Sequence, residues 1–411
     1  MKNSKTYPWV VVGLLWVVAL LNYLDRQMLS TMQPSMQHDI SELQSSENFG
    51  ILMGIFLLIY GFMSPVAGYV ADRINRKWII VGSLFVWSLV TYLMGHAETF
   101  NQLKILRALM GVSEALYIPA GLSLIADYHS DKSRSLAIGI HMTGLYMGQA
   151  LGGFGATIAS KFSWQLTFHY FGIAGIIYAV VLLLFLKEKQ KNTEERLEDA
   201  DTPMLLKGKT LGLLFTNISF WVLLFYFAVP SLPGWATKNW LPTLFSQNLN
   251  IPMEQAGPLS TITIAFSSFI GVIIGGTLSD RWVQTNIRGR VYTSAIGIAL
   301  TIPAIMLVGF GHTTFAVVAS AFCFGVGYGM FDANNMPILC QIVPERLRAT
   351  AYGIMNMVGV FFGYLITQYL GKSTDSGDLG SDFAMLSGIV AFALLIQLLF
   401  LKPKKLSSTD D

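Results

Sequence analysis

Apolar stretches of about 20 residues recur along the whole chain, separated by short polar connections. A helix of about 20 residues is about 30 Å long, which is enough to cross the hydrocarbon core of a bilayer. The chain is 53% hydrophobic and only 12% charged, whereas a soluble domain carries about 25% charged residues. These features predict an all-α membrane protein.

The apolar stretches predict twelve transmembrane helices in two sets of six. The first set is expected near residues 8–32, 48–71, 78–95, 103–127, 135–159 and 164–186. The second set is expected near residues 213–243 (interrupted by Pro230 and Pro233), 256–280, 290–310, 313–339, 347–370 and 383–401. The segment between the sets is highly charged and has no apolar periodicity, which predicts a solvated linker. The predicted organisation is therefore a bundle at 1–186, a linker at 187–210 and a second bundle at 211–411.

Basic residues concentrate on one side of the predicted membrane. Loops on the side of the two termini, with the central linker, contain 21 of the 27 Lys and Arg residues. Four lysines are placed on the opposite side, namely Lys104, Lys161, Lys238 and Lys372. Because Lys and Arg are enriched in cytoplasmic loops, both termini and the linker are expected in the cytoplasm. The small net charge of +3 predicts no nucleic-acid partner.

Two loop motifs occur once in each half. The sequences "GYVADR" and "GGTLSDR" share the spacing Gly-x-x-x-Asp-Arg and begin the motif 208 residues apart, at Gly68 and Gly276. The sequences "RSLAIG" and "RATAYG" begin 214 residues apart, at Arg134 and Arg348. Two six-helix halves with matched motifs predict a pseudo-symmetric transporter, whose halves rock about a site near the middle of the membrane.

Over essentially its whole length the chain resembles the major facilitator superfamily, in "GYVADRINRK", "RALMG" and "GLYMGQALGG". In that superfamily the loop motif latches helix ends and biases the rocking equilibrium. The resemblance therefore implies a conformational gating role for Gly68, Asp72, Arg73, Asp280 and Arg281. Gln149 stands where antiporters usually carry proline, which weighs against an antiporter. Close packing between helices is the plainer explanation for most of the glycines.

Four ionisable residues fall inside predicted spans of the first half, namely Asp25, Arg26, Arg107 and Glu114. A charge at the centre of the bilayer costs about 2.5–3.5 kcal/mol on insertion scales, so such residues need partners or a function. Arg107 and Glu114 share one helix face, about 10 Å apart along the axis. We predict a crosswise arrangement, in which Asp25 forms a salt bridge with Arg107 and Arg26 turns toward Glu114 and a central cavity. A static network that only joins two helices is the alternative.

The chemistry of these four residues suits coupled binding of an anion and a proton. A desolvated carboxyl group favours its neutral form, and a nearby arginine favours the charged form. Such a carboxyl group can therefore change its protonation when a substrate takes the arginine. The planar guanidinium of arginine offers two parallel donors to a carboxylate, whereas lysine offers a point charge.

The sequences "NYLDR", "RALMGVSEALYIPA" and "NWLPTLF" resemble the anion:cation symporter family, which includes bacterial sugar-acid transporters. The resemblance implies proton coupling by Asp25 and Glu114. It also implies that Arg26 binds the substrate carboxylate and that Arg107, paired with Asp25, modulates the same site. The spinster-like lipid carriers share the same four residues, and "LIADYHSDKSRS" resembles them as well. A lipid or lysolipid carrier is therefore the alternative function.

Other polar and aromatic residues inside the spans are candidates for the cavity wall. We predict that two tyrosines stack on a sugar ring and that four polar residues bind its hydroxyl groups, namely Tyr23, Tyr117, His141, Gln149, Asn335 and Asn356. Helix packing and local hydrogen bonds are the competing explanation for each of them. Asp332 is a candidate for cation binding, or pairs with the backbone near Pro337.

No phosphate-binding glycine loop, Ser/His/Asp set or metal-ligand cluster is present in the sequence. We therefore expect neither an enzyme nor an ATP-driven pump, and no cofactor beyond a proton gradient, with sodium coupling left open. The predicted function is proton-coupled symport of a small organic anion by a monomer. A sugar acid (a hexuronate, an aldonate or sialic acid) is the favoured class. A non-transporting receptor built on the same fold is a further alternative.

Overall fold

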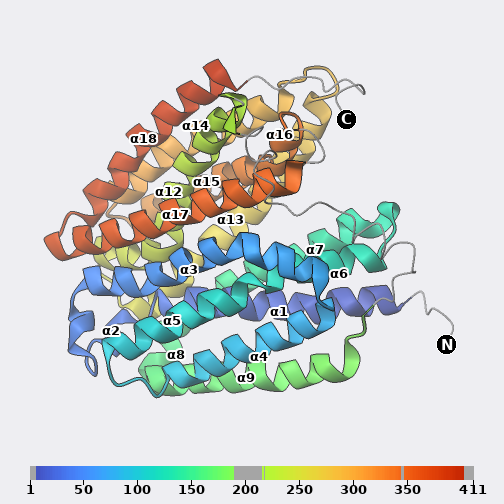
Figure 1. Cartoon of the computed structure of the whole chain (residues 1–411). Coiled ribbons are helices and arrows are strands. Elements are labelled where there is room, and N and C mark those ends of the chain that lie inside the picture. The colour runs from blue at the N-terminus through green and yellow to red at the C-terminus, as the bar shows by residue number, and fades with distance from the viewer. Residues whose placement is uncertain (1–5, 189–214, 217, 344–346, 402–411) are drawn as a thin grey trace. The chain divides into compact units, whose positions relative to one another are not determined.

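The computed structural model describes residues 6–188, 215–216, 218–343 and 347–401. Within these residues the chain consists of helices and connecting turns, without a β-strand (Figure 1). The first half contains α1 (Tyr7–Leu29), α2 (Gln33–Met36), the 3-10 helix η1 (Ser41–Gln44), α3 (Ser46–Arg73), α4 (Arg76–Met94), α5 (Phe100–Ala115), α6 (Tyr117–Tyr128), α7 (Asp131–Gly152), α8 (Gly155–Lys161) and α9 (Trp164–Phe185). The second half contains α12 (Ile218–Leu249), α13 (Met253–Trp282), α14 (Gly289–Phe310), α15 (Thr314–Asp332), α16 (Asn335–Cys340), α17 (Arg348–Ser376) and α18 (Leu379–Phe400).

The predicted all-α membrane fold is confirmed. Among the described residues, 11 helical segments are long and apolar enough to cross a membrane. The remaining predicted span corresponds to α7, in which polar residues such as His141 and Gln149, together with several glycines, dilute the apolar content. The chain is thus a multi-pass membrane protein.

Proline positions explain where the helices are continuous and where they break. Helix α12 runs through Pro230, Pro233 and Pro242, so the predicted interruption at Pro230 and Pro233 is wrong. Hydroxyl groups of neighbouring Ser and Thr residues bond to the carbonyl oxygens of the same helix, Ser231 to Phe227 and Thr237 to Pro233. Proline leaves the carbonyl group four residues earlier without its N–H donor, and neither of these two carbonyls is such a group, so the bonds add to the regular helix without replacing the missing ones.

Two other predicted spans are divided into two helices. The first break lies at Leu116, between α5 and α6, and the second at Ala333 and Asn334, between α15 and α16. Each break precedes a proline, Pro119 or Pro337, by one turn. Proline has no N–H to donate to the carbonyl group four residues earlier, so the regular hydrogen bonding of the helix stops there.

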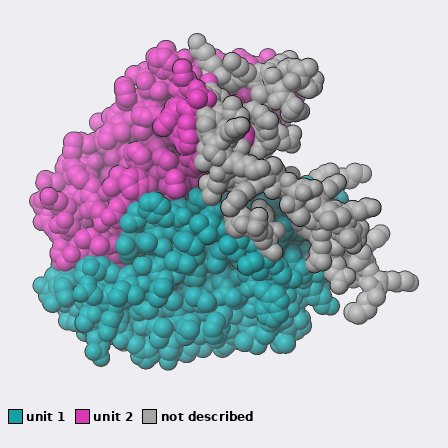
Figure 2. All heavy atoms as spheres, in the orientation of Figure 1, with its two compact units in different colours: residues 1–44, 55–204 teal, residues 45–54, 205–411 magenta. Residues whose placement is uncertain are grey.

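The chain forms two compact units (Figure 2). Unit 1 comprises residues 1–44 and 55–204, and unit 2 comprises residues 45–54 and 205–411, so α3 begins in unit 2 and continues in unit 1. In unit 1, α1 packs against α7 and α4 against α9; in unit 2, α15 packs against α13 and α14, and α12 against α17. Almost all of the predicted linker at 187–210 lies outside the described residues, and its boundaries stay a prediction.

Candidate functional site

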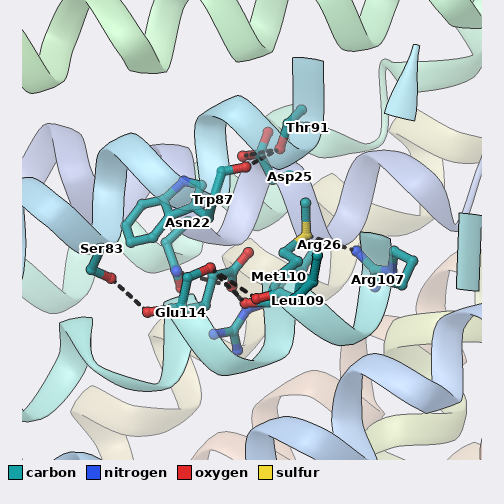
Figure 3. A network of polar contacts seen from close by, with 11 residues as sticks. Asn22, Asp25, Arg26, Ser83, Trp87, Thr91, Arg107, Leu109, Met110 and Glu114 are labelled. Carbon is teal, nitrogen blue, oxygen red and sulfur yellow. Dashed lines mark hydrogen bonds and ion pairs between the residues drawn. The ribbon is translucent and has the colours of Figure 1, made fainter. Parts of the chain in front are cut away.

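An ion pair joins α1 to α5 inside unit 1. The Nε atom of Arg26 lies 2.6 Å from Oε2 of Glu114, and the two side chains are 12% and 0% exposed. The same carboxylate oxygen accepts a hydrogen bond of 3.0 Å from Nδ2 of Asn22, one turn before Arg26 on α1 (Figure 3). Arg26 therefore faces Glu114, as the sequence predicts.

Three aromatic rings surround the Arg26 guanidinium. Its Cζ atom lies 5.1 Å from the ring centroid of Tyr23, 4.8 Å from that of Phe56 and 4.5 Å from that of Tyr60. Cation–π attraction at such distances favours the charged guanidinium, and the rings restrict its orientation. Tyr23 thus lies beside the predicted anion ligand.

Close packing between α3 and α5 brings two of these rings to the site. A Cβ atom at Gly111 would lie 2.8 Å from the carbonyl oxygen of Phe56, so glycine at this position permits the approach. Sequence reasoning missed Asn22, Phe56 and Tyr60. The four-residue spacing of Phe56 and Tyr60, which places both on one helix face, was the available signal.

The predicted salt bridge between Asp25 and Arg107 is wrong, because no ion pair joins these two described residues. Asp25 is buried and accepts a hydrogen bond of 3.3 Å from Thr91 of α4. Arg107 is also buried, with Nη1 3.1 Å from the sulfur of Met110 and Cζ 4.7 Å from the Phe56 ring centroid. Consecutive residues of a helix point about 100° apart, so Asp25 faces α4 while Arg26 faces α5. Figure 3 shows the two contacts separately.

Four buried polar atoms of this cluster have no hydrogen-bond partner among the described residues. They are two donors and two acceptors, namely Arg26 Nη2, Arg107 Nε, Glu114 Oε1 and Asn22 Oδ1. A buried polar atom without a partner costs about 1–3 kcal/mol, and more when it belongs to a charged group. Such a concentration of unpaired groups is typical of a place that receives ligand atoms or water.

Tyr117 and His141 form a separate hydrogen-bonded pair in the core of unit 1. Both side chains are 0% exposed, and the Tyr117 hydroxyl lies 2.8 Å from both the Leu15 carbonyl oxygen and Nε2 of His141. A carbonyl oxygen can only accept, so the hydroxyl donates to Leu15 and Nε2–H of His141 donates to the hydroxyl. In this arrangement Tyr117 has no exposed face with which to stack on a sugar. Gln149 of α7 is buried as well.

The predicted gating residues lie at helix ends. Asp280 and Arg281 are exposed at the end of α13, and Asp280 Oδ1 lies 3.4 Å from Nη2 of Arg290. A Cβ atom at Gly68 would meet no atom within 4 Å, so packing does not require glycine there. The side chains of Asp72 and Arg73 lie outside the described part of the structure. The gating role of these residues stays a prediction.

In unit 2 one polar candidate lies at the break between α15 and α16, and the other lies on α17. Asn335 is buried and its Nδ2 donates to Oδ1 of Asp332 over 3.2 Å, whereas Asn356 of α17 is half-buried. Lys238, expected on the side opposite the termini, lies within α12, 11 residues before the last residue of that helix.

Comparisons with known proteins agree with this architecture. The family model described as "Major Facilitator Superfamily" matches residues 15–368. The chain is 25% identical to the hexuronate transporter of Bacillus subtilis (strain 168), over 96% of this chain and 94% of that protein. It is 27% identical to protein spinster homolog 1 of Xenopus laevis, over 94% of this chain and 77% of that protein.

A solved structure shares the fold. The inward-facing, occupied form of a bacterial homolog of the human lysosomal transporter Spinster has a TM-score of 0.80 to this chain. The match covers 98% of this chain and 100% of the other, at 20% sequence identity. At this identity the likeness concerns the fold.

Proposed function

The chain belongs to the Major Facilitator Superfamily, and on that premise we propose that it imports an organic anion, a sugar acid of the hexuronate type, together with protons. One observation supports the proposal. Arg26 is surrounded by three aromatic rings, its aromatic cage, and forms an ion pair with the buried Glu114, while its Nη2 atom has no hydrogen-bond partner among the described residues. A guanidinium that uses only part of its donor set can accept a carboxylate from the substrate. The relationship to a hexuronate transporter supports a sugar acid as the substrate class.

In this proposal Glu114 and the substrate carboxylate compete for one arginine. When Glu114 takes up a proton it loses its charge, so its bond to Arg26 weakens and the guanidinium becomes available. Since each binding event favours the other, proton and anion are bound and released together. Asp25, which accepts a hydrogen bond from Thr91, would supply a second protonation site.

The remaining predicted ligands would bind the uncharged part of the substrate. Tyr23 lies against Arg26 and offers a ring for stacking. The half-buried Asn356 offers an amide group to a hydroxyl. The other candidates are buried and would reach the substrate only if the site opens further, namely Gln149, Asn335, His141 and Arg107. We expect a monomer in a bacterial inner membrane with both termini in the cytoplasm.

A lysolipid with an anionic headgroup is the second candidate substrate. It is supported by 27% identity to a spinster protein, slightly more than the identity to the hexuronate transporter. A phosphate headgroup would also accept hydrogen bonds from Arg26. The polar and charged character of the unpaired groups around Arg26 favours a compact, polar substrate over a lipid.

Uptake into proteoliposomes tests the proposal. The panel contains radiolabelled glucuronate, galacturonate, gluconate, sialic acid and a lysophospholipid, each measured with and without an inward proton gradient. We expect one of the sugar acids to accumulate only with the gradient. If no sugar acid is taken up while the lysophospholipid is moved, the chain is a lipid carrier and the proposal is wrong.

A further inference from the structure

A short motif is repeated at the two helix breaks. Residues 114–119 read "EALYIP" and residues 332–337 read "DANNMP", so each has an acidic residue, an alanine, three other residues and a proline. The chain leaves regular helix at the same place in both, three residues before the proline, at Leu116 and Asn334. Asp332 therefore occupies in unit 2 the position that Glu114 occupies in unit 1.

A cation accompanies the carboxyl group in both copies. Lys238 follows Arg26 by 212 residues, which lies between the offsets of 208 and 214 residues of the repeated loop motifs. Its Nζ atom lies 4.6 Å from the ring centroid of Trp235, as Arg26 lies against Tyr23. Lys238 attracts the Asp332 carboxylate electrostatically, whereas Arg26 forms a direct ion pair in unit 1. Each unit thus combines a carboxylate, a cation and an aromatic ring.

The Asp332 side of α15 is turned toward α12. Tyr328, one turn before Asp332, has its ring directly against Gly234, and Phe331 stacks on Phe227 with ring centroids 6.3 Å apart. Asp332 itself keeps an exposed side chain. A carboxylate that is exposed on the α12 side of its helix, at membrane depth, is positioned to meet a polar ligand and not lipid.

Two amide oxygens next to Asp332 receive no hydrogen bond from the described residues. Oδ1 of Asn334 and Oδ1 of Asn335 are buried without a partner among the described residues, and both side chains are at least 97% buried. Each amide nitrogen donates one hydrogen bond, Asn334 Nδ2 to the Met330 carbonyl and Asn335 Nδ2 to Asp332. The site thus offers unpaired acceptor oxygens to a ligand, and the ammonium group of Lys238 offers donors.

Hydroxyl groups fit these acceptors better than a metal cation does. Lys238 already places a positive charge near Asp332, and a second positive charge would be repelled by it. A hydroxyl group is neutral, donates to a carboxylate or amide oxygen and accepts from an ammonium group. We propose that Asp332, Asn335 and Lys238 form a hydroxyl-binding subsite in unit 2, which selects the hydroxylated part of the substrate. The inference rests on the proposed function, because it assumes that the substrate is a sugar acid.

A comparison of substrate and protein variants tests the subsite. Transport of the preferred hexuronate and of its monodeoxy derivatives is measured for the wild type, Asp332→Asn and Lys238→Met. The matched control is Asp378→Asn, an exposed carboxylate of unit 2 whose side chain makes no cap hydrogen bond. Removing the recognised hydroxyl should lower kcat/KM of the wild type by about tenfold or more, because site groups are left unpaired. In Asp332→Asn the kcat/KM for the parent substrate should fall by a similar factor, and removing the same hydroxyl from the substrate should lower it little further.

The outcomes separate the subsite from the function itself. If the wild type transports no sugar acid, the proposed function fails. Suppose that the wild type does transport a sugar acid. If Asp332→Asn and Lys238→Met then prefer the parent substrate over its deoxy derivatives as strongly as the control Asp378→Asn does, the proposed subsite is wrong. A dependence on sodium that is lost in Asp332→Asn would also overturn it, in favour of a cation site. Thermal stabilisation of the purified variants by the hexuronate provides a second measurement should transport be too slow to follow.

Discussion

Arg26 is the residue on which the proposed function depends. Its neighbours are one carboxylate and three aromatic rings, so its position is held while part of its donor set stays unpaired. Planarity matters here, because a flat guanidinium can lie against rings and present parallel donors at its edge. A lysine at this position would keep the charge and lose both properties.

Arg26→Lys should therefore raise KM for the transported anion at least tenfold while the protein still folds, since the charge opposite Glu114 is retained. Concentration-dependent uptake in proteoliposomes measures the effect. Arg288→Lys serves as the control for the exchange of residue type, because Arg288 lies just before the first residue of α14 and donates to the Leu398 carbonyl. Near-normal KM in Arg26→Lys would show that Arg26 is structural.

Glu114→Gln should abolish accumulation driven by the proton gradient and keep exchange of substrate across the membrane. Glutamine mimics the neutral carboxyl group, so the anion can bind, but no proton is released with it. Accumulation and counterflow are measured on the same proteoliposomes, with Glu98→Gln at an exposed position as the control. Gradient-driven accumulation at the wild-type level would remove Glu114 from the coupling role.

At the level of elements, the packing of α1 against α7 positions the charged residues of α1. Three glycines of α7 lie against the backbone or side chains of α1. The glycines are Gly144, Gly148 and Gly152, and the α1 residues include Trp16, Leu20, Leu24 and Gln27. The residues of α1 that meet the glycines recur every three or four positions, so the two helices contact each other along a continuous stripe. Close helix packing therefore explains why these three positions are glycine.

A single methyl group should disturb this contact. A Cβ atom at Gly148 would collide with the carbonyl oxygen of Leu20, which belongs to the backbone and cannot rotate away. Gly148→Ala should lower stability by about 1–3 kcal/mol and reduce transport, because α1 must move with Arg26. Gly139→Ala, on the same helix with no atom within 4 Å of its Cβ position, is the matched control. Equal melting temperatures of the two variants in detergent would contradict this account.

At the level of the whole molecule, the repeat of the two halves explains why the polar residues occur where they do. Each unit carries its acidic residue just before a proline-induced helix break, Glu114 in α5 and Asp332 in α15. A break frees backbone groups, and in a membrane these are tolerated only where protein or water surrounds them. The repeated break therefore marks the interior of each unit.

The distribution of basic residues predicts the orientation of the whole chain. Fluorescent proteins that mature only in the cytoplasm should fluoresce when fused to either terminus, because 21 of the 27 basic residues lie on the side of the termini and the linker. Fusion after Lys372, which is predicted on the opposite side, is the control and should remain dark. Fluorescence at only one terminus would contradict an even number of spans.

The local pattern of the sequence was sufficient to predict the helices and the identity of the buried charges. Apolar stretches of membrane length determine the spans, because a chain in lipid must satisfy its backbone hydrogen bonds within helices. The four ionisable residues of the first half were identified because charge is rare at such depth. The predicted interruption of α12 at its prolines was wrong. The helix breaks at Leu116 and Asn334 each precede a proline and lie inside a single predicted span.

Only the tertiary structure decided which charges meet. Asp25 and Arg26 are neighbours in sequence but face different helices, so Asp25 contacts Thr91 and leaves Arg107 beside Phe56 and Met110. The aromatic cage of Arg26 depends on the close approach of α3 to α5 at Gly111, which no local pattern reports. Side-chain type and helical periodicity are local properties, whereas the partner of a buried group depends on how helices distant in sequence pack together.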